Sequence, residues 1–345
     1  MSPIPNARVL FNSHPESYPT PGETTVYDTT KTIDLQSVPL NGGFLIKTLV
    51  LSIDPFLRYR MNRGADDRVG GFQIGAPLDG FGIGVVLRSE TPEVQVGDYV
   101  YGITIIFQEY TVYPALDKLQ IIKKHPKLPL SAYLGAAGMT GQTAYLGWKA
   151  YADAKPGEVA FVTTGAGAVG SIVIQLAKQA GMKVIASAGS EDKVAFMRSL
   201  GADVAFNYET TDTRAILEKE GPINVFWDHI GGEITDAGIE YAAEGARILS
   251  VGYISGLNSS EAPQIKKFPL ISLKSLHIHG IFVPPLLQIP GYRDEFYEVM
   301  PRKLVSGEIK HVEDLTTGLD QVGEVMLAVL KGTNKGKAVV VVAEE

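Results

Sequence analysis

The chain has 345 residues, of which 45% are hydrophobic and 20% charged, and its formal net charge is −7. This length is sufficient for two domains, and without a basic stripe we expect no nucleic-acid partner. The chain contains no cysteine, which excludes disulfides, thiol catalysis and thiolate metal sites. Because no signal peptide or membrane-spanning run is recognisable, we expect a cytoplasmic protein.

Residues 1–125 predict a β-rich domain. Short apolar or β-branched runs are separated by Gly, Pro and Asp, and helical periodicity is nearly absent. We interpret this region as a partly open barrel. Strands are expected at Val26–Lys31, Gly43–Leu51, Gly80–Leu87, Asp98–Ile106 and Gln108–Val112.

From Leu128 onward the pattern changes to an alternation of strands and helices, which predicts a doubly wound parallel sheet. Strands are expected at Val159–Val162, Lys183–Ala188, Val204–Asn207, Val225–Asp228, Arg247–Val251 and Ile278–Val283. Helices are expected at Ser131–Trp148, after Gly167, and at Glu191–Leu200, Thr213–Lys219 and Ile234–Ala243.

The last segment contains a predicted helix at Val322–Leu330 and an apolar run at Lys337–Val342. We expect this run to return to the sheet of the first domain, because it is too apolar for a free edge. The predicted domains are therefore 1–128 together with 301–345, and 129–300.

A strand, a glycine turn and a helix follow one another within Val159–Ala180. The segment Gly165-Ala166-Gly167-Ala168-Val169-Gly170 fits G-x-G-x-x-G, and in this context it predicts dinucleotide binding. Gly165 would allow the tight turn, Gly167 the approach of a pyrophosphate, and Gly170 close packing of helix on strand. The alternative is an ordinary glycine turn of an α/β protein.

The residues after the second strand of this domain favour NADPH over NADH. NAD-dependent enzymes place an acid there for the ribose 2′-OH, whereas this chain has Ser187-Ala188-Gly189-Ser190. Lys193 follows one helical turn later and would supply a cation for the 2′-phosphate. Glu191 and Asp192 are interpreted as acids at the start of a helix. A solvated helix lysine is the alternative for Lys193.

Seven segments along nearly the whole chain carry recognisable motifs: Ser52–Arg58, Leu134–Tyr145, Gly165–Ser171, Ala188–Lys193, Phe206–Tyr208, Asp228–Gly232 and Gly332–Lys337. In this order they resemble the motifs of the zinc-independent medium-chain dehydrogenase/reductases of the leukotriene B4 dehydrogenase, prostaglandin reductase and alkenal double-bond reductase group. The resemblance implies an α/β protein with a GroES-like, partly open β-barrel catalytic domain and a Rossmann cofactor domain.

The resemblance also implies roles for individual residues. Ala166, Gly167, Ala168 and Val169 would line the pyrophosphate. The 2′-phosphate would be bound by Ser190, Lys193 and Tyr208, beside Gly189. The nicotinamide half would be surrounded by Gly252, Tyr253, Phe282, Val283 and Asn334, with Met139 and Thr143 close by. His229, in place of the usual Asn, would hydrogen-bond the cofactor or simply fill its site. Candidate residues of the substrate pocket are Phe56, Arg58, Tyr59, Tyr253, Leu257, Phe282 and Pro285; for Arg58 a structural ion pair is the alternative.

Two departures from the family pattern affect the proton donor. The family tyrosine of I-S-x-Y-N is Leu257 here, and the tyrosine of D-P-Y is Phe56. Tyr253 and Tyr59 are the candidates that take over this role.

The six histidines are scattered, so we expect no metal site. We predict an NADPH-dependent, metal-free oxidoreductase that reduces the C=C bond of α,β-unsaturated aldehydes or ketones by hydride transfer to the β-carbon. The alternatives are an NADPH-dependent quinone reductase and a non-catalytic NADPH-binding protein. The family also implies a homodimer.

Overall fold

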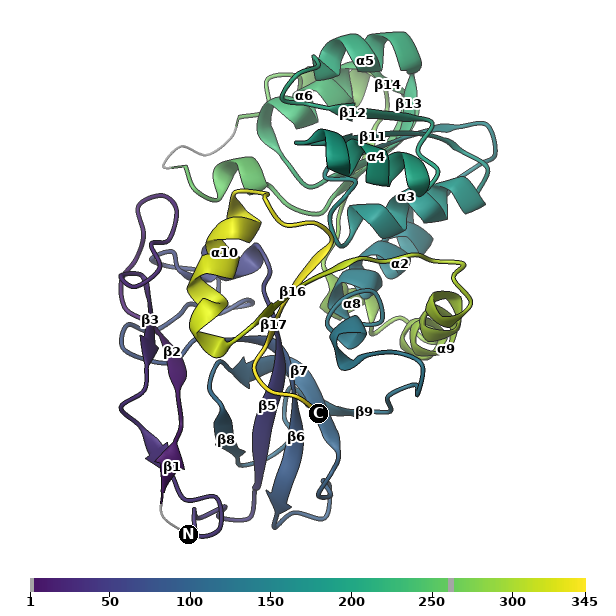
Figure 1. The fold of residues 1–345 in the computed structure, drawn as a ribbon. Coiled ribbons are helices and arrows are strands. Elements are labelled where there is room, and N and C mark those ends of the chain that lie inside the picture. The colour runs from purple at the N-terminus through teal and green to yellow at the C-terminus, as the bar shows by residue number, and fades with distance from the viewer. Residues whose placement is uncertain (1–2, 260–263) are drawn as a thin grey trace. The chain divides into compact units, whose positions relative to one another are not determined.

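The computed structural model describes residues 3–259 and 264–345 (Figure 1). Its contacts divide the chain into a first unit, Met1–Leu134 with Glu313–Glu345, and a second unit, Gly135–Val312. These boundaries fall later in the chain than the predicted ones at 128/129 and 300/301. Within the first unit, Ser131 Oγ donates to Glu313 Oε2 (2.6 Å). Within the second, Lys310 and Gln175 form two 2.8 Å hydrogen bonds. Ser131 and Glu313 therefore belong to the first unit, and Lys310 belongs to the second.

The first unit is built on a seven-stranded sheet in the order β16-β17-β5-β6-β7-β9, in which β8 also pairs with β5. Its strands are β5 (Phe44–Ser52), β6 (Asp79–Ser89), β7 (Tyr99–Ile106), β8 (Tyr110–Tyr113), β9 (Leu119–Ile122), β16 (Glu313–Thr317) and β17 (Lys337–Val341). Two small sheets pair β1 (Ile4–Pro5) with β4 (Thr32–Ile33) and β2 (Arg8–Phe11) with β3 (Thr25–Asp28). The helical elements are α1 (Phe56–Arg60), η1 (Leu130–Tyr133), η3 (Leu319–Gln321) and α10 (Val322–Leu330).

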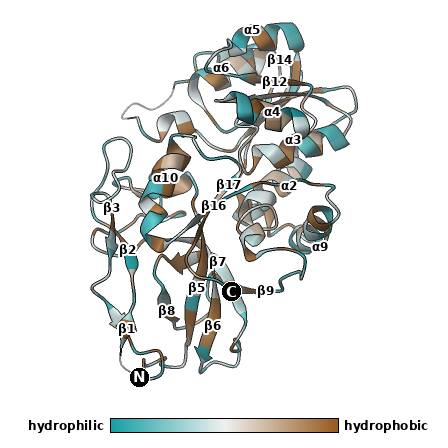
Figure 2. Ribbon diagram, viewed as in Figure 1, coloured by the Kyte–Doolittle hydropathy of each residue, from teal (hydrophilic) through white to brown (hydrophobic). Residues whose placement is uncertain are grey.

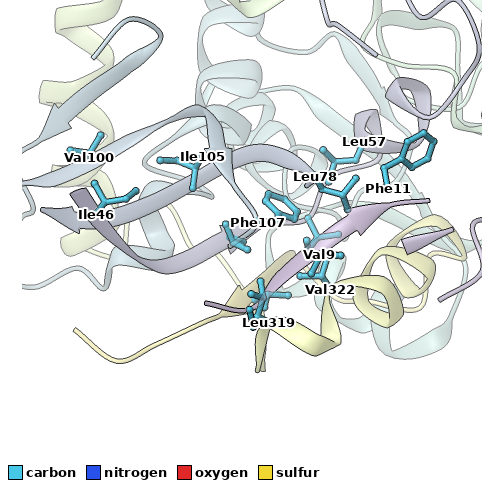
Figure 3. Packing of buried hydrophobic residues seen from close by; sticks show 14 of the residues in the cluster. Val9, Phe11, Ile46, Leu57, Leu78, Val100, Ile105, Phe107, Leu319 and Val322 are labelled. Carbon is cyan, nitrogen blue, oxygen red and sulfur yellow. The ribbon is translucent and has the colours of Figure 1, made fainter. Parts of the chain in front are cut away.

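The predicted return of the last apolar run to the first sheet is confirmed. Strand β17 pairs antiparallel with β5, with Val340 opposite Leu51. Figure 3 shows the core beneath this sheet, where side chains from β2, β5, β7 and α10 pack together. The hydrophobic colouring of β5 and β6 in Figure 2 reflects this burial.

The second unit contains a six-stranded sheet in the order β12-β11-β10-β13-β14-β15. All neighbouring strands are parallel, which confirms the predicted doubly wound sheet. The strands are β10 (Val159–Val162), β11 (Lys183–Ala188), β12 (Val204–Asn207), β13 (Ile223–Asp228), β14 (Ala242–Ser250) and β15 (His277–Gly280). The helices are α2 (Met139–Tyr151), α3 (Gly170–Gln179), α4 (Glu191–Ser199), α5 (Thr213–Glu220), α6 (Gly232–Glu240), η2 (Ile254–Gly256), α7 (Pro269–Leu273), α8 (Val283–Leu286) and α9 (Tyr292–Val305).

Two predicted elements of this region differ from the structure. The single helix expected at Ser131–Trp148 is wrong, because a non-helical segment separates η1 from α2. That segment folds back on the helix so closely that a Cβ on Gly141 would lie 1.8 Å from Ala136 O. The strand expected at Ile278–Val283 ends at Gly280, because the prolines that follow begin a short helix.

Candidate cofactor-binding and active site

Most of the predicted cofactor residues follow the carboxyl end of a strand in the second unit. Because these strands are parallel, their carboxyl ends meet at one edge of the sheet, where open α/β sheets bind ligands. Gly165–Gly170 follow β10; Gly189, Ser190 and Lys193 follow β11; Tyr208 follows β12; His229 follows β13; Gly252 and Tyr253 follow β14; and Phe282 and Val283 follow β15.

The glycine turn is held closely against its surroundings. Thr164, which precedes it, adopts the left-handed conformation (φ +49°), and its carbonyl oxygen accepts a hydrogen bond from Gly167 N–H (2.8 Å). A Cβ on Gly165 would lie 2.6 Å from Met197 Sδ, and one on Gly170 would lie 2.4 Å from Thr164 O. The turn therefore requires glycine at both positions for packing reasons.

The amino end of α3 has the donors that a pyrophosphate needs. Gly167, Ala168 and Val169 are partly exposed, whereas Ala166 is buried. The N–H groups of Ala168 and Val169 lie just ahead of Gly170, the first residue of α3. The first turn of the ten-residue helix carries no acid. N–H groups at the positive end of a helix dipole fit a dinucleotide pyrophosphate.

A second group of donors follows β11 and β12. Tyr208 N–H donates to Ala188 O (3.1 Å), and a Cβ on Gly189 would lie 2.8 Å from Tyr208 Oη. The phenol ring is thereby packed directly against the Gly189 backbone. Ser190 occupies the N-cap position of α4 without a side-chain capping hydrogen bond, and Lys193 lies in the first turn of that helix. A phenol, a hydroxyl and an ammonium group are suitable partners for a 2′-phosphate. The first-turn acids Glu191 and Asp192 are exposed.

The loop after β13 is shaped by Asp228. This buried carboxylate accepts hydrogen bonds from Ile230 N–H (2.8 Å), Gly231 N–H (3.2 Å) and the hydroxyl of Thr235. Burial raises its pKa, although the hydrogen bonds oppose that shift. Gly231 has a φ of +79°, and a Cβ there would lie 2.9 Å from Tyr253 Cβ. The loops after β13 and β14 are therefore packed against each other.

His229 has protein partners on both ring nitrogens. Trp227 Nε1–H donates to its Nε2 (3.3 Å), and its Nδ1 lies 3.0 Å from Thr163 O and 2.8 Å from Thr164 Oγ1. Desolvation lowers the pKa of the imidazole to about 4, so the ring is neutral near pH 7. Both ring nitrogens of His229 are thus within hydrogen-bond reach of protein atoms, which favours the alternative in which His229 fills its site over a hydrogen bond to the cofactor.

The predicted residues after β14 and β15 differ in exposure. Tyr253 is 42% exposed and Phe282 and Pro285 are exposed, whereas Leu257 is buried. The segment that contains Tyr253 is anchored to the loop after β13, because Ile254 N–H donates to His229 O (3.1 Å) and Ser255 Oγ donates to Ile230 O (2.6 Å). On α2, the Thr143 hydroxyl donates to Met139 O (2.9 Å) within its own helix.

In the first unit, a buried ion pair fixes the segment that begins α1. Lys337 Nζ lies 3.0 Å from Asp54 Oδ1 and also donates to the carbonyl oxygens of Ile53 (2.9 Å) and Ala338 (3.0 Å). Asn334 lies in the connection that leads to Lys337, where its Nδ2 donates to Gly336 O (3.1 Å). The ion pair thus joins the segment that leads to the predicted pocket residue Phe56 to the segment that follows the predicted nicotinamide residue Asn334.

The predicted pocket residues of α1 have different surroundings. Phe56 is partly exposed and contacts Phe81 edge to face (6.0 Å between ring centroids). Tyr59 Oη accepts a hydrogen bond from Asp66 N–H (3.3 Å). Arg58 is 3% exposed, and its guanidinium donates to the carbonyl oxygens of Ser17 and Pro15. The guanidinium also donates to Asn62 Oδ1 (2.5 Å), and these contacts favour a structural role for Arg58.

Sequence reasoning missed four contributors to this arrangement. Thr163, Thr164 and Trp227 hold His229, and Lys337 holds Asp54. The sequence contains only a weak indication of these roles: the two threonines directly precede the glycine motif, and Lys337 ends the segment Gly332–Lys337. The partners of the two threonines and of Lys337 are far away in the sequence, so no local pattern identifies these contacts.

The cavities of the second unit lie away from these residues. A cavity of about 430 Å³ is lined by Tyr151, Arg247, His277 and His279 near the amino ends of β14 and β15. Among the residues that the structure describes, no group of three or more His, Asp or Glu side chains is arranged to hold a metal ion. Within the same residues, no helix has the length and apolar character of a membrane span.

Two family models match the chain. Residues 7–122 match the N-terminal domain of oxidoreductase, and residues 168–303 match zinc-binding dehydrogenase. The chain is 32% identical to an NADP(+)-dependent 2-alkenal reductase of Nicotiana tabacum, over 99% of both chains, and 32% identical to (+)-pulegone reductase of Mentha piperita, over 88% of this chain and 89% of that one. Among solved structures, CurA from Vibrio vulnificus in complex with NADPH is similar with a TM-score of 0.86 and 29% identity, covering 98% of this chain and all of the other.

Proposed function

Because the chain belongs to the medium-chain dehydrogenase/reductase family, in its group of NADP-dependent double-bond reductases, we propose that it reduces the C=C bond of α,β-unsaturated aldehydes and ketones. NADPH is its cofactor. The observation that carries the proposal is the carboxyl edge of the second sheet, where the amino end of α3 and the Tyr208–Gly189 contact match the two phosphate-bearing parts of NADPH.

In this reaction NADPH supplies the hydride that reduces the β-carbon of the substrate. The protein binds and orients the reactants. Ala168 and Val169 N–H would hold the pyrophosphate, and Ser190, Lys193 and Tyr208 would hold the 2′-phosphate. Asp228 would act indirectly, since it shapes the loop on which Tyr253 is packed. Positioning of this kind supplies a large part of the rate in a two-substrate reaction.

Protonation of the α-carbon requires a donor, for which Tyr253 is our first choice. Its ring is 42% exposed and its segment is anchored to the loop after β13. Tyr59 is the second choice, because its hydroxyl oxygen already accepts a hydrogen bond from Asp66 N–H. Phe56, Leu257, Phe282 and Pro285 are proposed to contact the substrate, and Asn334, Gly252 and Val283 the nicotinamide half.

The test is NADPH oxidation, followed by absorbance, with a 2-alkenal, a cyclic enone, a quinone and a saturated aldehyde. We expect turnover of the alkenal and the enone, with NADPH strongly preferred over NADH. Activity restricted to the quinone would support the quinone reductase, and NADPH binding without any turnover would support the non-catalytic protein. Turnover of the saturated aldehyde alone would contradict all three.

Lys193→Ala tests the cofactor preference. We expect a selective rise in the KM for NADPH, because a cation in the first turn of α4 is removed. Lys219→Ala is the matched control, since Lys219 is an exposed lysine of the same unit whose partner Glu220 keeps a second lysine, Lys183. An equal effect of both variants would refute a specific role for Lys193.

We also propose a homodimer, formed through strand β15. In the described sheet β15 has a neighbour on one side only, and Ile278 on that strand is 46% exposed. Leu273 and Phe268, which precede β15, are exposed as well. Ile278→Glu should shift the mass measured by light scattering to that of a monomer, whereas Leu315→Glu on β16, an edge strand of the first unit's sheet, should not.

A cytoplasmic location stays a prediction, which cell fractionation tests.

A further inference from the structure

We propose that His229 is a positioning residue for dinucleotide binding, which fixes Thr164 and through it the glycine turn of residues 165–170. The proposal rests on the NADPH-dependent function above and assigns to His229 a role different from direct contact with the cofactor. It follows from three connected observations in the second unit: the tautomer of the ring, the conformation of Thr164 and the packing of the turn on Thr164.

The hydrogen bonds determine which ring nitrogen carries the proton. An indole N–H can only donate, so Trp227 Nε1–H requires His229 Nε2 to accept. The proton of the neutral ring is therefore on Nδ1, where Thr163 O at 3.0 Å and Thr164 Oγ1 at 2.8 Å are both within reach. Trp227 is fully buried, so its donor has no solvent alternative, and this arrangement fixes the orientation of the ring.

The backbone around the histidine strengthens the same link. His229 N–H donates to Thr163 Oγ1 (2.9 Å), and Thr163 Oγ1 donates to Trp227 O (3.2 Å). Thr163 N–H also donates to Trp227 O (3.1 Å). The ends of β10 and β13 are thus joined by both side chains and main chain, at the point where the glycine turn begins.

Thr164 transmits this constraint to the turn. A β-branched residue at a φ of +49° is strained, so the surrounding contacts must hold it there. The hydroxyl of Thr164 is held by His229, while its carbonyl oxygen accepts from Gly167 N–H (2.8 Å) and is packed against Gly170, where a Cβ would lie 2.4 Å away. If the imidazole is removed, Thr164 can relax toward ordinary φ values, and the turn that carries the N–H groups of Ala168 and Val169 can shift with it.

The test compares His229→Phe, Thr164→Gly and the double variant. We expect His229→Phe to weaken NADPH binding about tenfold or more, with kcat changed much less than KM. Binding of adenosine 2′-monophosphate, which probes only the Lys193 and Tyr208 region, should be unchanged. In the Thr164→Gly background, where glycine adopts a positive φ without strain, the effect of His229→Phe should shrink to about twofold.

The controls separate this inference from the proposed function. His277→Phe replaces an imidazole of the same unit, at the amino end of β15, with a phenyl ring and should leave NADPH binding unchanged. If the wild-type protein neither binds NADPH nor reduces enones, the proposed function fails. If the wild type does both and His229→Phe binds NADPH normally, or loses the same affinity in both backgrounds, the positioning role alone is refuted.

A spectroscopic readout avoids the dependence on a stable His229 variant. In a long-range ¹H–¹⁵N NMR spectrum of histidine-labelled protein, the His229 signal is assigned as the one that shifts most in Trp227→Phe. In the wild type this signal should show the proton on Nδ1 and should not titrate near neutral pH. A proton on Nε2, or a ring that titrates with an ordinary histidine pKa, would overturn the proposal.

Discussion

Lys337 and Asp54 form an ion pair, 3.0 Å between Nζ and Oδ1, in which the two residues are only 3% and 5% exposed. Removing one partner leaves the other charge buried and unpaired, which typically costs about 3–5 kcal/mol. We therefore expect Lys337→Met to lower the free energy of unfolding by about this amount, measured by chemical denaturation. Lys331→Met, an exposed lysine of the same unit, should change it little. Equal midpoints for the two variants would show that the buried pair does not stabilise the fold.

The stability of the protein should depend on pH through His229. The pKa of His229 is about 4 in the folded protein and near 6.5 in the unfolded chain. Between these two values the unfolded chain therefore holds a proton on His229, whereas the folded protein does not. Stability is then fully present above about pH 6.5 and falls as the pH decreases toward 4, by about 1–2 kcal/mol at pH 5. Unfolding midpoints of the wild type and His229→Phe, measured between pH 5 and 8, should show a shallower dependence in the variant. Parallel curves would assign the acid sensitivity to other groups.

Gly189→Ala should selectively disturb the 2′-phosphate region. The added Cβ would lie 2.8 Å from Tyr208 Oη, and because that ring is 45% exposed it can move aside. We expect a change in stability of no more than about 0.5 kcal/mol, together with a reduced preference for NADPH over NADH in KM. In a Tyr208→Ala background, Gly189→Ala should have no further effect, and a persistent effect there would refute steric displacement of the phenol.

Tyr253→Phe should separate chemistry from binding. If its hydroxyl delivers the proton, kcat falls about 100-fold or more, within the range typical of general acids, while the KM for NADPH changes little. Tyr59→Phe, whose hydroxyl oxygen accepts from a backbone N–H, is expected to have a smaller effect. A normal kcat in both variants would leave water as the proton source, and solvent isotope effects on each variant provide the independent measurement.

Local patterns were sufficient for most of the second sheet. Strand β10 and helix α3 are read directly from apolar periods on either side of the glycine motif, because both elements bury continuous apolar faces. Where chain segments pack tightly on one another, periodicity was misleading. The helical period of Ser131–Trp148 hides the break at residues 134–138, which depends on the contact between Gly141 and Ala136 O.

The residues of the candidate site could be named from the sequence, but the contacts between them could not. The glycines, Lys193 and Tyr208 could be named because each follows a strand end or a recognisable motif. The role of Asp54 could not, since Lys337 is 283 residues away. His229 was named as a candidate from its motif, but its contacts with Thr163 and Thr164 become evident only when β10 and β13 are adjacent.

The position of β17 has a consequence for synthesis on the ribosome. This strand lies between β16 and β5 in the first sheet, yet it follows all of the second unit in the sequence. The second unit is continuous in the sequence, whereas the first unit receives β17 only after the second unit has been translated, so β5 lacks its partner at Val50–Ser52 until then. In the nascent chain, a strand that is translated after the second unit therefore completes a sheet whose strand β5 was translated before it.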